Sequence, residues 1–224
     1  MSDALERATR REALIPAGTI GLPGDLVVPF PGVGAVVFAH GSGSGRRSPR
    51  NRQVARSLNE AGLATLLFDL LTPAEASDRR NVFDVPLLAS RLAAATDWLA
   101  EQPEVAGLRG GYFGASTGAA AALWAAAEPG ARVAAVVSRG GRPDLAGPRL
   151  GAVRAPTLLI VGGDDPLVLE WNREARQALR CPTELAIVPG ASHLFEERGA
   201  LEQVAELARA WFTRYLPAGA AGAA

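Results

Sequence analysis

The 224-residue sequence contains no lysine, so all 23 of its basic residues are arginine. This absence excludes Schiff-base catalysis on a lysine amine. It also excludes a Walker-A phosphate loop, whose lysine reaches the β- and γ-phosphates. The arginines are balanced by 23 acidic residues, which gives a formal net charge of zero. A balanced charge argues against a protein that mainly grips nucleic-acid phosphates, so we expect no nucleic-acid partner.

Cysteine and histidine are nearly absent from the chain. Cys181 is the single cysteine and therefore cannot form an intrachain disulfide. One cysteine and two histidines cannot supply the four ligands of a Cys/His zinc site. A metal would need a cluster of carboxylates, and no such cluster stands out in the sequence. We therefore expect neither a metal nor a cofactor.

Long apolar runs are also missing. The segment Met1–Arg11 is polar and lacks the apolar core of a signal peptide. Nowhere does the chain reach the run of about 18 apolar residues that a transmembrane helix needs. The Ala-rich segment Ala119–Ala127 is too short to span a bilayer and favours an ordinary helix. We expect a cytoplasmic protein without a membrane partner, with flexible ends at residues 1–11 and 217–224.

Hydrophobic residues make up 48% of the chain, enough for a sizeable core. Short apolar runs without polar alternation are separated by longer helical patterns, which predicts a mostly parallel sheet covered by helices on both faces. The predicted strands are Ala35–Ala39, Ala64–Asp69, Gly111–Phe113, Val133–Ser138, Thr157–Val161 and Glu184–Val188. The predicted helices are Pro49–Ala61, Val85–Glu101, Thr117–Ala127, Val168–Leu179 and Ala200–Tyr215. No repeat or long linker interrupts this order, so we predict one α/β domain over residues 1–224.

The segments outside this alternation are short. Ile15–Ile20 and Leu26–Val28 flank Pro23-Gly24 and predict an antiparallel hairpin at the sheet edge. Thr72–Asp84 and Arg139–Ala152 are too short to form a separate cap domain. We therefore expect a shallow site without a large cap. The apolar side chains expected at its rim are Leu70, Phe83, Trp171 and Phe195.

The candidate nucleophile is Ser116, since ligands in such folds bind at the carboxyl ends of the strands. Directly after the strand Gly111–Phe113 comes Gly114-Ala115-Ser116-Thr117-Gly118, followed at once by a predicted helix. A G-x-S-x-G sequence between a strand and a helix is typical of a nucleophile elbow, which would hold the Ser116 hydroxyl above the sheet. The alternative is that Ser116 only caps the helix.

A serine nucleophile needs a base, and the base needs an orienting acid. His193 lies in the loop after the last predicted strand, which favours it as the base. Asp164 and Asp165 both follow the preceding strand and compete for the role of the acid. Asp165 precedes Pro166 and is biased toward extended backbone, although it could instead cap the following helix. The chain order serine, aspartate, histidine is that of the α/β-hydrolase arrangement.

Two backbone amides are candidates for the oxyanion hole. One is the Thr117 N–H. The other is the Ser42 N–H, in the narrow loop His40-Gly41-Ser42-Gly43 after the first parallel strand. For the His40 side chain we favour a structural role, holding that loop by hydrogen bonds, with substrate contact as the alternative.

The chain resembles the small serine hydrolases of the α/β-hydrolase superfamily, in the dienelactone-hydrolase-like branch. The resemblance spans residues 34–216 and implies an eight-stranded, mostly parallel sheet and a Ser-Asp-His triad. The family's acid motif, G-x-x-D with x-x-V, matches Gly162, Asp165 and Val168 and so selects Asp165. True dienelactone hydrolases use a cysteine nucleophile, whereas this chain has Ser116. The segments that carry the resemblance are Phe38–Gly45, Leu66–Leu71, Gly111–Gly118, Gly162–Asp165 and Ala191–Phe195.

Arginines near the predicted site are candidates for binding an anionic substrate group. Arg139 is the best placed, because it follows a strand's carboxyl end. The groups Arg46–Arg52 and Arg139–Arg142 could bind a carboxylate or phosphate, or could be solvated and paired with acids such as Asp144. Asp69, at another strand end, is expected to fix a loop.

The sequence therefore predicts a hydrolase that cleaves a small carboxylic ester, thioester or lactone by acyl transfer through Ser116, His193 and Asp165. A binding or sensing module with the same fold and no turnover is one alternative. A phosphoribosyl-type transferase is a weaker one, because Asp164-Asp165 resembles the acidic pair of that class but is followed by Pro166 rather than a phosphate loop. A homodimer is left open.

Overall fold

The computed structural model describes residues 7–217. Residues 1–6 and 218–224, which belong to the ends expected to be flexible, lie outside the described residues. The prediction for residues 9–11 was wrong, because the first strand already begins at Thr9. These residues pair with Val28, Val27 and Leu26 of the next strand, so their backbone is held in the sheet.

Eight strands form one sheet in the order β1-β2-β4-β3-β5-β6-β7-β8. Strands β1 and β2 run antiparallel to their neighbours, and all other pairs are parallel. The strands are β1 (Thr9–Ala17), β2 (Ile20–Val28), β3 (Gly34–Ala39), β4 (Leu63–Phe68), β5 (Gly110–Ala115), β6 (Val133–Arg139), β7 (Thr157–Gly162) and β8 (Thr183–Val188). The predicted mostly parallel α/β sheet of about eight strands is confirmed.

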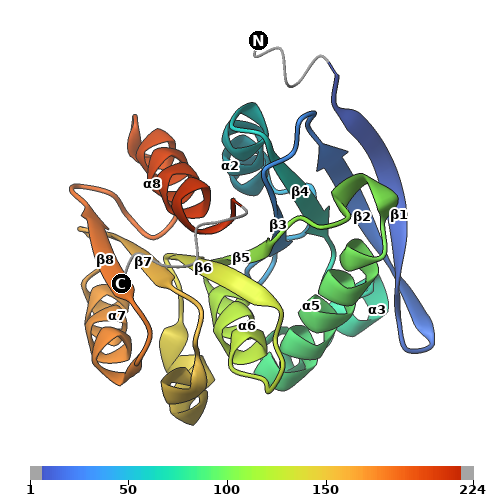
Figure 1. Ribbon diagram of the computed structural model, residues 1–224. Coiled ribbons are helices and arrows are strands. Elements are labelled where there is room, and N and C mark those ends of the chain that lie inside the picture. The colour runs from blue at the N-terminus through green and yellow to red at the C-terminus, as the bar shows by residue number, and fades with distance from the viewer. Residues whose placement is uncertain (1–6, 218–224) are drawn as a thin grey trace.

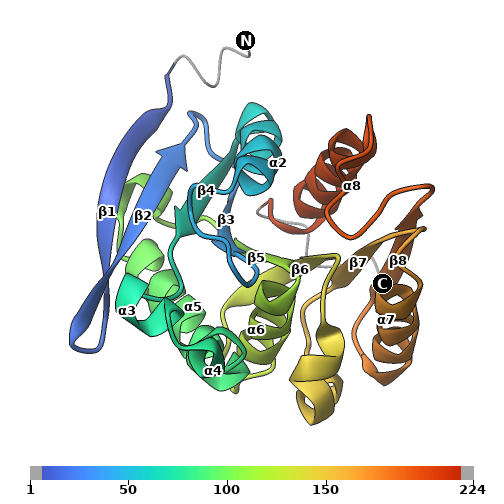
Figure 2. The ribbon, with the colours of Figure 1, turned by 180° about the vertical axis from the view of Figure 1, so that it is seen from behind.

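Helices cover both faces of this sheet (Figures 1 and 2). Helices α2 and α8 pack side by side on one face, while α5, α6 and α7 lie on the other. The helices are α2 (Pro49–Glu60), α3 (Pro73–Ala76), α4 (Arg79–Val82), α5 (Val85–Ala100), α6 (Thr117–Ala126), α7 (Pro166–Ala178) and α8 (Ala200–Tyr215), with 3₁₀ segments η1 (Pro103–Val105) and η2 (Pro143–Ala152).

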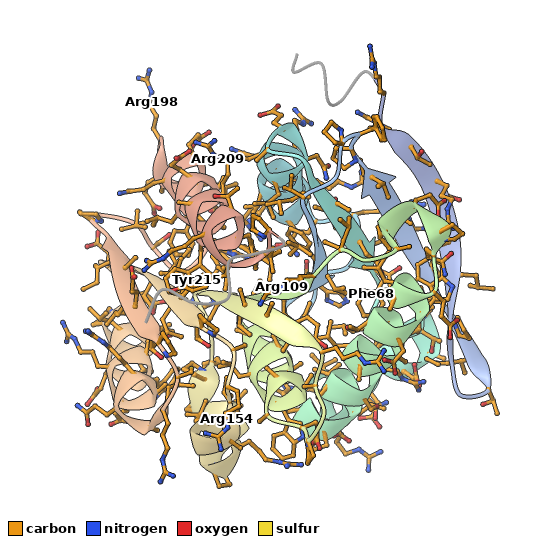
Figure 3. The ribbon with its side chains drawn as sticks, viewed as in Figure 1. Phe68, Arg109, Arg154, Arg198, Arg209 and Tyr215 are labelled. Carbon is orange, nitrogen blue, oxygen red and sulfur yellow. The ribbon has the colours of Figure 1, made fainter. Side chains whose placement is uncertain are left out.

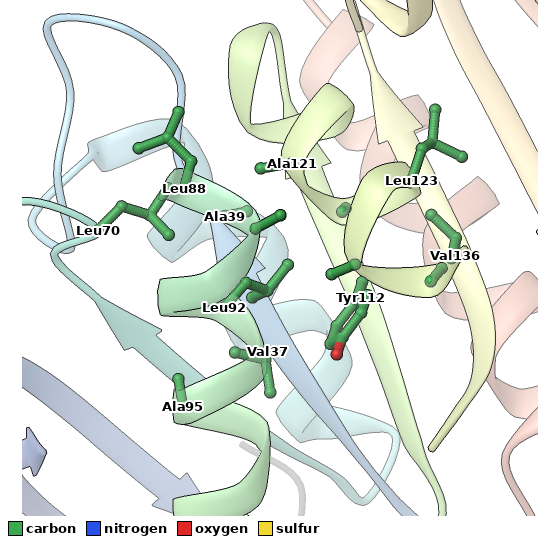
Figure 4. Packing of buried hydrophobic residues seen from close by; sticks show 14 of the residues in the cluster. Val37, Ala39, Leu70, Leu88, Leu92, Ala95, Tyr112, Ala121, Leu123 and Val136 are labelled. Carbon is green, nitrogen blue, oxygen red and sulfur yellow. The ribbon is translucent and has the colours of Figure 1, made fainter. Parts of the chain in front are cut away.

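The strands are buried on both faces because their side chains alternate between two cores. In β3, Val36 and Phe38 point into the core under α2 and α8. The neighbouring Val37 and Ala39 point into the opposite core, where α5 and α6 pack. Figure 4 shows that second core, with Val37 and Tyr112 of the sheet facing Leu92 of α5. Every residue of β3 is buried, so the missing polar alternation is explained by cover on both sides.

The edge hairpin forms, but its turn is not where the sequence placed it. The strands β1 and β2 are joined by the two residues Gly18 and Thr19, and Pro23-Gly24 lies within β2. Gly18 has a φ of +67°, a conformation that glycine adopts without strain and that tight hairpin turns require. The Pro-Gly pair suggested a turn, yet Pro23 sits opposite Leu14 in the strand ladder.

Predicted and observed helix boundaries differ by no more than two residues. The largest difference is at α7, which begins at Pro166 instead of Val168. Proline suits the first turn of a helix because its missing N–H has no partner there anyway.

Among residues 7–217, no helix combines the length and the apolar character needed to cross a bilayer.

Arginines cover much of the outer surface, and Arg154 and Arg198 are exposed (Figure 3). Arg139, at the end of β6, is the one arginine classed as buried within the described part of the chain. The carboxyl ends of β3, β4, β5, β6, β7 and β8 lie at one edge of the sheet, because these strands are parallel neighbours. Each loop that carries a candidate site residue leaves the sheet at this edge.

Candidate active site

Ser116 stands on a sharp turn between β5 and α6. Its backbone has φ +51° and ψ −119°, outside the regions that non-glycine residues favour. Such a conformation is strained by about 1–3 kcal/mol and persists only where the surrounding structure enforces it. The Ser116 N–H donates to the Arg139 carbonyl at 3.2 Å, and the Ser116 carbonyl accepts from the Arg142 N–H at 3.1 Å. The turn is therefore fixed to the last residue of β6 and to the loop that follows β6.

The two glycines of the G-x-S-x-G sequence allow this turn by their lack of a side chain. A Cβ at Gly114 would overlap the backbone of Ala119 at the start of α6. A Cβ at Gly118 would overlap the carbonyl groups of Ala39 and His40. Both positions therefore require glycine for backbone approach.

Ser116 occupies the cap position of α6, but its hydroxyl makes no capping hydrogen bond. Its side chain instead lines a cavity of about 160 Å³ together with His193. Ser116 therefore lines this cavity, and its hydroxyl does not cap α6 as the alternative supposed. The residues that line this cavity are Gly41, Ser42, Ser44, Ser48, Arg50, Ala115, Ser116, Arg139, His193 and Leu194.

His193 and Asp165 are in direct contact. The Nδ1 atom of His193 lies 2.7 Å from Oδ2 of Asp165, so the ring donates this hydrogen bond to the carboxylate. Asp165 also sits at the cap position of α7, yet it makes no capping hydrogen bond. Its carboxylate accepts the hydrogen bond from His193 and does not cap α7. Asp164 is exposed and makes no side-chain hydrogen bond or ion pair within residues 7–217.

The loops that carry the acid and the base are held against each other. The Gly163 N–H donates to the Val188 carbonyl at 2.8 Å, and the Asp164 N–H donates to the Ala191 carbonyl at 3.0 Å. A Cβ at Gly162 would overlap the Ala191 carbonyl, so this approach also requires glycine. These contacts fix the position of Asp165 relative to His193 before any substrate binds.

The loop that carries Ser42 is held by His40 and Asp69. His40 Nδ1 donates to the Gly41 carbonyl, and its Nε2 accepts from the Leu70 N–H, each at 3.0 Å. An Nε2 that accepts must be unprotonated, so these two bonds require the neutral ring. Burial lowers the pKa of His40 below 6.5, which outweighs the opposing effects of the Gly41 carbonyl and the Asp69 charge. Both His40 nitrogens are thus used by backbone, which gives the ring a structural role.

Asp69 fixes the same loop from the end of β4. Its Oδ1 accepts from the Arg46 N–H at 2.7 Å, and its Oδ2 lies 3.3 Å from Arg46 Nε. Arg46 also pairs with Asp25 of β2 at 3.1 Å. The Ser42 N–H therefore belongs to a loop that is attached to β2, β4 and β3 at once.

The predicted oxyanion donors come from two different elements. Ser42 lines the cavity at the Ser116 side, and Gly41 lies so close to Ser116 that an added Cβ would be 3.1 Å from the Ser116 Cβ. Thr117 is buried at the first position of α6, directly after Ser116. The first backbone N–H groups of a helix have no partner within the helix, so the Thr117 N–H is available.

A second cavity of about 200 Å³ lies on the other side of the Ser42 loop. It shares Gly41, Ser42 and Ser44 with the cavity at Ser116. Its walls are largely apolar and come from the segment after β4 and from α5, where Leu70 and Leu88 lie close together (Figure 4). Leu70 is fully buried, so it forms a wall of this cavity and not an exposed rim.

The predicted rim was wrong at Phe195. Its ring is 1% exposed and lies under the guanidinium of Arg139, whose Cζ is 5.8 Å from the ring centroid. Leu194, which is 39% exposed, lines the cavity in its place. Phe195 has a φ of +56°, and this turn reverses the side-chain direction that an extended loop would give. Phe83 and Trp171 do not line either cavity.

The arginines near the site fall into two groups. Arg46 and Arg52 pair with Asp25, and Arg142 forms a two-point pair with Asp144 and lies over the Trp171 ring. Arg139 and Arg50 line the cavity beside Ser116. Arg50 belongs to the group Arg46–Arg52 that the sequence offered for anion binding, and it lies in the first turn of α2. Among residues 7–217, no group of three or more His, Cys, Asp or Glu side chains could hold a metal ion.

Residues 29–216 match the family described as the dienelactone hydrolase family. The chain belongs to the dienelactone hydrolase family. A crystal structure of the dienelactone hydrolase from Anabaena variabilis is 55% identical to it and superposes with a TM-score of 0.90, covering 94% of this chain and 99% of that one. The family resemblance and the α/β-hydrolase fold expected from the sequence are thus confirmed, and membership supports hydrolase activity.

Two further comparisons bear on function. Est1E from Butyrivibrio proteoclasticus has a TM-score of 0.76 at 16% identity, covering 90% of this chain and 97% of that one, and so shares the fold. A Mycobacterium tuberculosis protein named "Putative phosphoribosyl transferase Rv0571c" is 62% identical over 205 residues, which cover 92% of this chain and 46% of the relative. This family member therefore spans about half the length of that curated relative.

The contact between Asp165 and His193 predicts different effects at the two adjacent aspartates. In this dienelactone hydrolase family member, Asp165→Asn should favour the wrong imidazole tautomer and lower kcat by about four decades, as in the protease triad. Asp164→Asn, the matched control, should change kcat by less than about tenfold. Steady-state ester hydrolysis by both variants, with folding checked by circular dichroism, measures the difference. A dead Asp164→Asn enzyme, or two active ones, would contradict this assignment.

The neutral His40 predicts a pH dependence of stability. Because its pKa is lower in the folded than in the unfolded chain, its contribution is complete above about pH 6.5 and is lost as the pH falls through the folded pKa. In His40→Gln, the side-chain oxygen can still accept from the Leu70 N–H but does not titrate. We expect the melting temperature to fall less in this variant than in the unmodified protein between about pH 7.5 and about pH 5.5. Equal falls in both proteins would show that His40 is not the titrating group.

Proposed function

We propose that this protein is a serine hydrolase that cleaves a small carboxylic ester, thioester or lactone through an acyl-enzyme on Ser116. One observation carries the proposal. Ser116 is held in a strained elbow and faces a cavity that it shares with His193, whose ring is hydrogen-bonded to Asp165. A nucleophile, a base and an orienting acid in this order are the groups that acyl transfer requires.

The proton moves first between serine and histidine. With Nδ1 donating to Asp165, the other ring nitrogen of His193 is free to accept the Ser116 hydroxyl proton. As it does so, the Ser116 Oγ forms a bond to the carbonyl carbon, and the carbonyl electron pair moves onto oxygen. Asp165 stabilises the charged ring without taking its proton. When the bond to the leaving group breaks, that group takes the proton from His193.

Water completes the reaction by the same route. His193 takes a proton from water as the water oxygen attacks the acyl carbon, and the Ser116 oxygen then leaves with the proton. In both halves the tetrahedral oxyanion accepts hydrogen bonds from the Ser42 and Thr117 N–H groups. These donors are backbone amides on a braced loop and a helix start, so they need little reorganisation. Loss of one such donor costs about two to three decades in kcat in a serine protease.

The cavity volumes favour a small substrate. The cavity at Ser116 is about 160 Å³ and its apolar neighbour is about 200 Å³. Pockets for drug-sized ligands are typically about 300–1,000 Å³. The apolar cavity, walled in part by Leu70 and Leu88, suits a short alkyl group. The segment over it carries only the short helices α3 and α4.

The longer mycobacterial relative is named a putative phosphoribosyl transferase. The surroundings of Asp164 and Asp165 in this chain do not favour that activity. In the transferase alternative, Asp164 and Asp165 would act together on a ribose next to a phosphate loop. Asp165 is instead bonded to His193, and helix α7 begins at the next residue, Pro166. The strain at Ser116 likewise supports an active nucleophile over a binding module without turnover.

Removal of the Ser116 hydroxyl tests the proposal. Ser116→Ala should lower kcat for short-chain esters by several decades and abolish labelling by a fluorophosphonate probe, because only an activated serine reacts readily. Ser90→Ala is the matched control, since Ser90 is exposed on α5 and its hydroxyl donates only to the Leu87 carbonyl. The control should label and turn over as the unmodified protein does. Normal turnover by pure Ser116→Ala would exclude this mechanism.

Acyl-chain length tests the size of the site. Acetyl to butyryl esters should be hydrolysed with a higher kcat/KM than esters with acyl chains of about ten or more carbons, because the long chains exceed the cavity. A series of p-nitrophenyl esters that differ only in chain length gives the comparison. A preference for the long chains would require an acyl tunnel that the two small cavities do not provide.

A further inference from the structure

A cavity of about 460 Å³ lies at the edge of the sheet opposite the candidate active site. Its walls include residues at the start of three neighbouring parallel strands, namely Ala35 of β3, Gly110 of β5 and Val133 of β6. Strand β5 runs from Gly110 to Ala115, and at about 3.3 Å per residue it separates this cavity from the turn at Ser116 by about 16 Å. The cavity shares no described lining residue with either cavity near Ser116.

Small residues leave this space open, and close packing does not require all of them. Among the described residues, a Cβ added at Gly110 would meet only the Arg132 carbonyl, at 3.6 Å, which is an ordinary contact distance. At the next residue, Gly111, a Cβ would lie 2.7 Å from the Phe212 ring, so glycine is needed there. The pairing of β5 with β6 shifts at the same point, which leaves Ala134 opposite no residue of β5. Bulges of this kind are frequent next to active sites, where they change the direction of side chains.

The inner walls of the cavity are uncharged. The Tyr112 hydroxyl points toward the amino ends of the strands (Figure 4), and it is 3.0 Å from Thr96 Oγ1. Thr96 donates its one hydroxyl proton to the Leu92 carbonyl at 2.8 Å and therefore accepts from Tyr112. Burial raises the pKa of Tyr112, so its hydroxyl stays neutral. The apolar side chains that line the cavity are Val37, Leu99, Val105, Leu108 and Val133.

The apolar surface continues outside the cavity. A Cβ at Gly32 would lie 3.1 Å from Leu108 Cδ1, so the loop between β2 and β3 packs against this wall. In the same loop, Phe30 is 64% exposed and Val33 is 36% exposed. Large apolar side chains that stay exposed beside an apolar cavity indicate a place for a hydrocarbon group.

The charges at the solvent side of the cavity are mainly positive. Arg109 is half-buried, and its carbonyl accepts from the Ala35 N–H at 3.0 Å, which holds it beside β3. Arg132 is exposed in the loop before β6. Within residues 7–217, neither guanidinium takes part in a hydrogen bond or an ion pair, and both arginines line the cavity. The carboxylate among the lining residues is that of the exposed Asp97, so positive charge exceeds negative charge here.

We propose that this cavity is a second ligand site, separate from the candidate active site, which binds a small amphipathic anion. The hydrocarbon body of the ligand lies between the apolar walls, and its anionic group faces Arg109 and Arg132. The volume of about 460 Å³ falls within the range of about 300–1,000 Å³ that is typical of small-molecule pockets. The guanidinium groups attract such an anion and repel a cation of the same shape. This inference does not depend on the chemistry proposed for Ser116.

Two ligands with similar straight chains and opposite charges test the inference. Decanoate and decyltrimethylammonium are titrated into the unmodified protein by calorimetry, below the concentrations at which either forms micelles. We expect the Kd of decanoate to be several-fold lower, because the arginines favour the anion. 2-Naphthoate, titrated in parallel, distinguishes a planar aromatic body from a flexible chain by which carboxylate binds more tightly. Equal Kd values for the two charges, or no binding of either carboxylate, would overturn the inference.

A variant that fills the cavity locates the binding. Gly110→Val places a side chain where the structure has room, and a β-branched residue suits a strand. We expect this variant to raise the Kd of decanoate by about tenfold or more while the hydrolysis of short esters stays unchanged, because the substitution is about 16 Å from Ser116. Unchanged decanoate binding by folded Gly110→Val would show that the ligand lies elsewhere.

Arg109→Gln gives a second variant if Gly110→Val does not fold. It should weaken the binding of decanoate several-fold and should not weaken that of decyltrimethylammonium. Arg154→Gln is the matched control, because Arg154 is exposed (Figure 3) and lines neither this cavity nor the one at Ser116. The control should bind decanoate as the unmodified protein does. Equal weakening in Arg109→Gln and Arg154→Gln would reduce the effect to overall charge and overturn the site.

A chain that ends at Pro217 separates a ligand site from a site for residues 218–224. We expect the full chain and the shortened chain to bind decanoate with the same Kd. Binding by the shortened chain alone would mean that residues 218–224 take this cavity, and it would overturn the inference.

Discussion

The strained backbone of Ser116 is the constraint on which the rest of the site depends. The chain can reverse there because Gly114 and Gly118 let β5 approach α6 and let α6 approach the end of β3. The same reversal places Ser116 beside Arg139, whose carbonyl holds the turn and whose side chain enters the cavity. A conformation that is unfavourable by about 1–3 kcal/mol thus aims one hydroxyl at the edge of the sheet where the six parallel strands end.

The charges around this turn follow two rules. Groups that hold the scaffold are neutral or paired: His40 is a neutral bridge between backbone groups, and Asp69 pairs with Arg46. Groups that face the cavity retain unused hydrogen-bonding capacity: within residues 7–217, the Nε of Arg139 is buried without an acceptor. Buried polar groups in stable proteins normally find partners, so an exception beside a candidate nucleophile indicates a place for a ligand. The protein thereby combines loops that are held by paired groups with a cavity where a buried arginine nitrogen has no acceptor within residues 7–217.

Local patterns were sufficient for the parallel strands, the five longer helices and the turn at Ser116, because buried parallel strands and the G-x-S-x-G sequence have strong local signatures. They did not predict the short helices α3 and α4. They misplaced the edge hairpin, since Pro23-Gly24 is as good a local turn signal as the Gly18 that forms the turn. They also could not predict that the Phe195 side chain is buried, or which arginine of the predicted group Arg46–Arg52 reaches the cavity. The first depends on a single positive φ and the second on how α2 packs against the sheet, and neither is encoded in neighbouring residues.

The central claim is that Ser116 carries the acyl group during turnover. Rapid acid quenching during hydrolysis of p-nitrophenyl acetate, followed by mass spectrometry of the intact protein and its peptides, observes this intermediate directly. We expect a transient acetyl adduct on the peptide that contains Ser116, and a larger steady-state fraction of this adduct in His193→Gln if deacylation is slowed more than acylation. Turnover with no adduct at any quench time, or an adduct that lies on a different residue, would contradict the account.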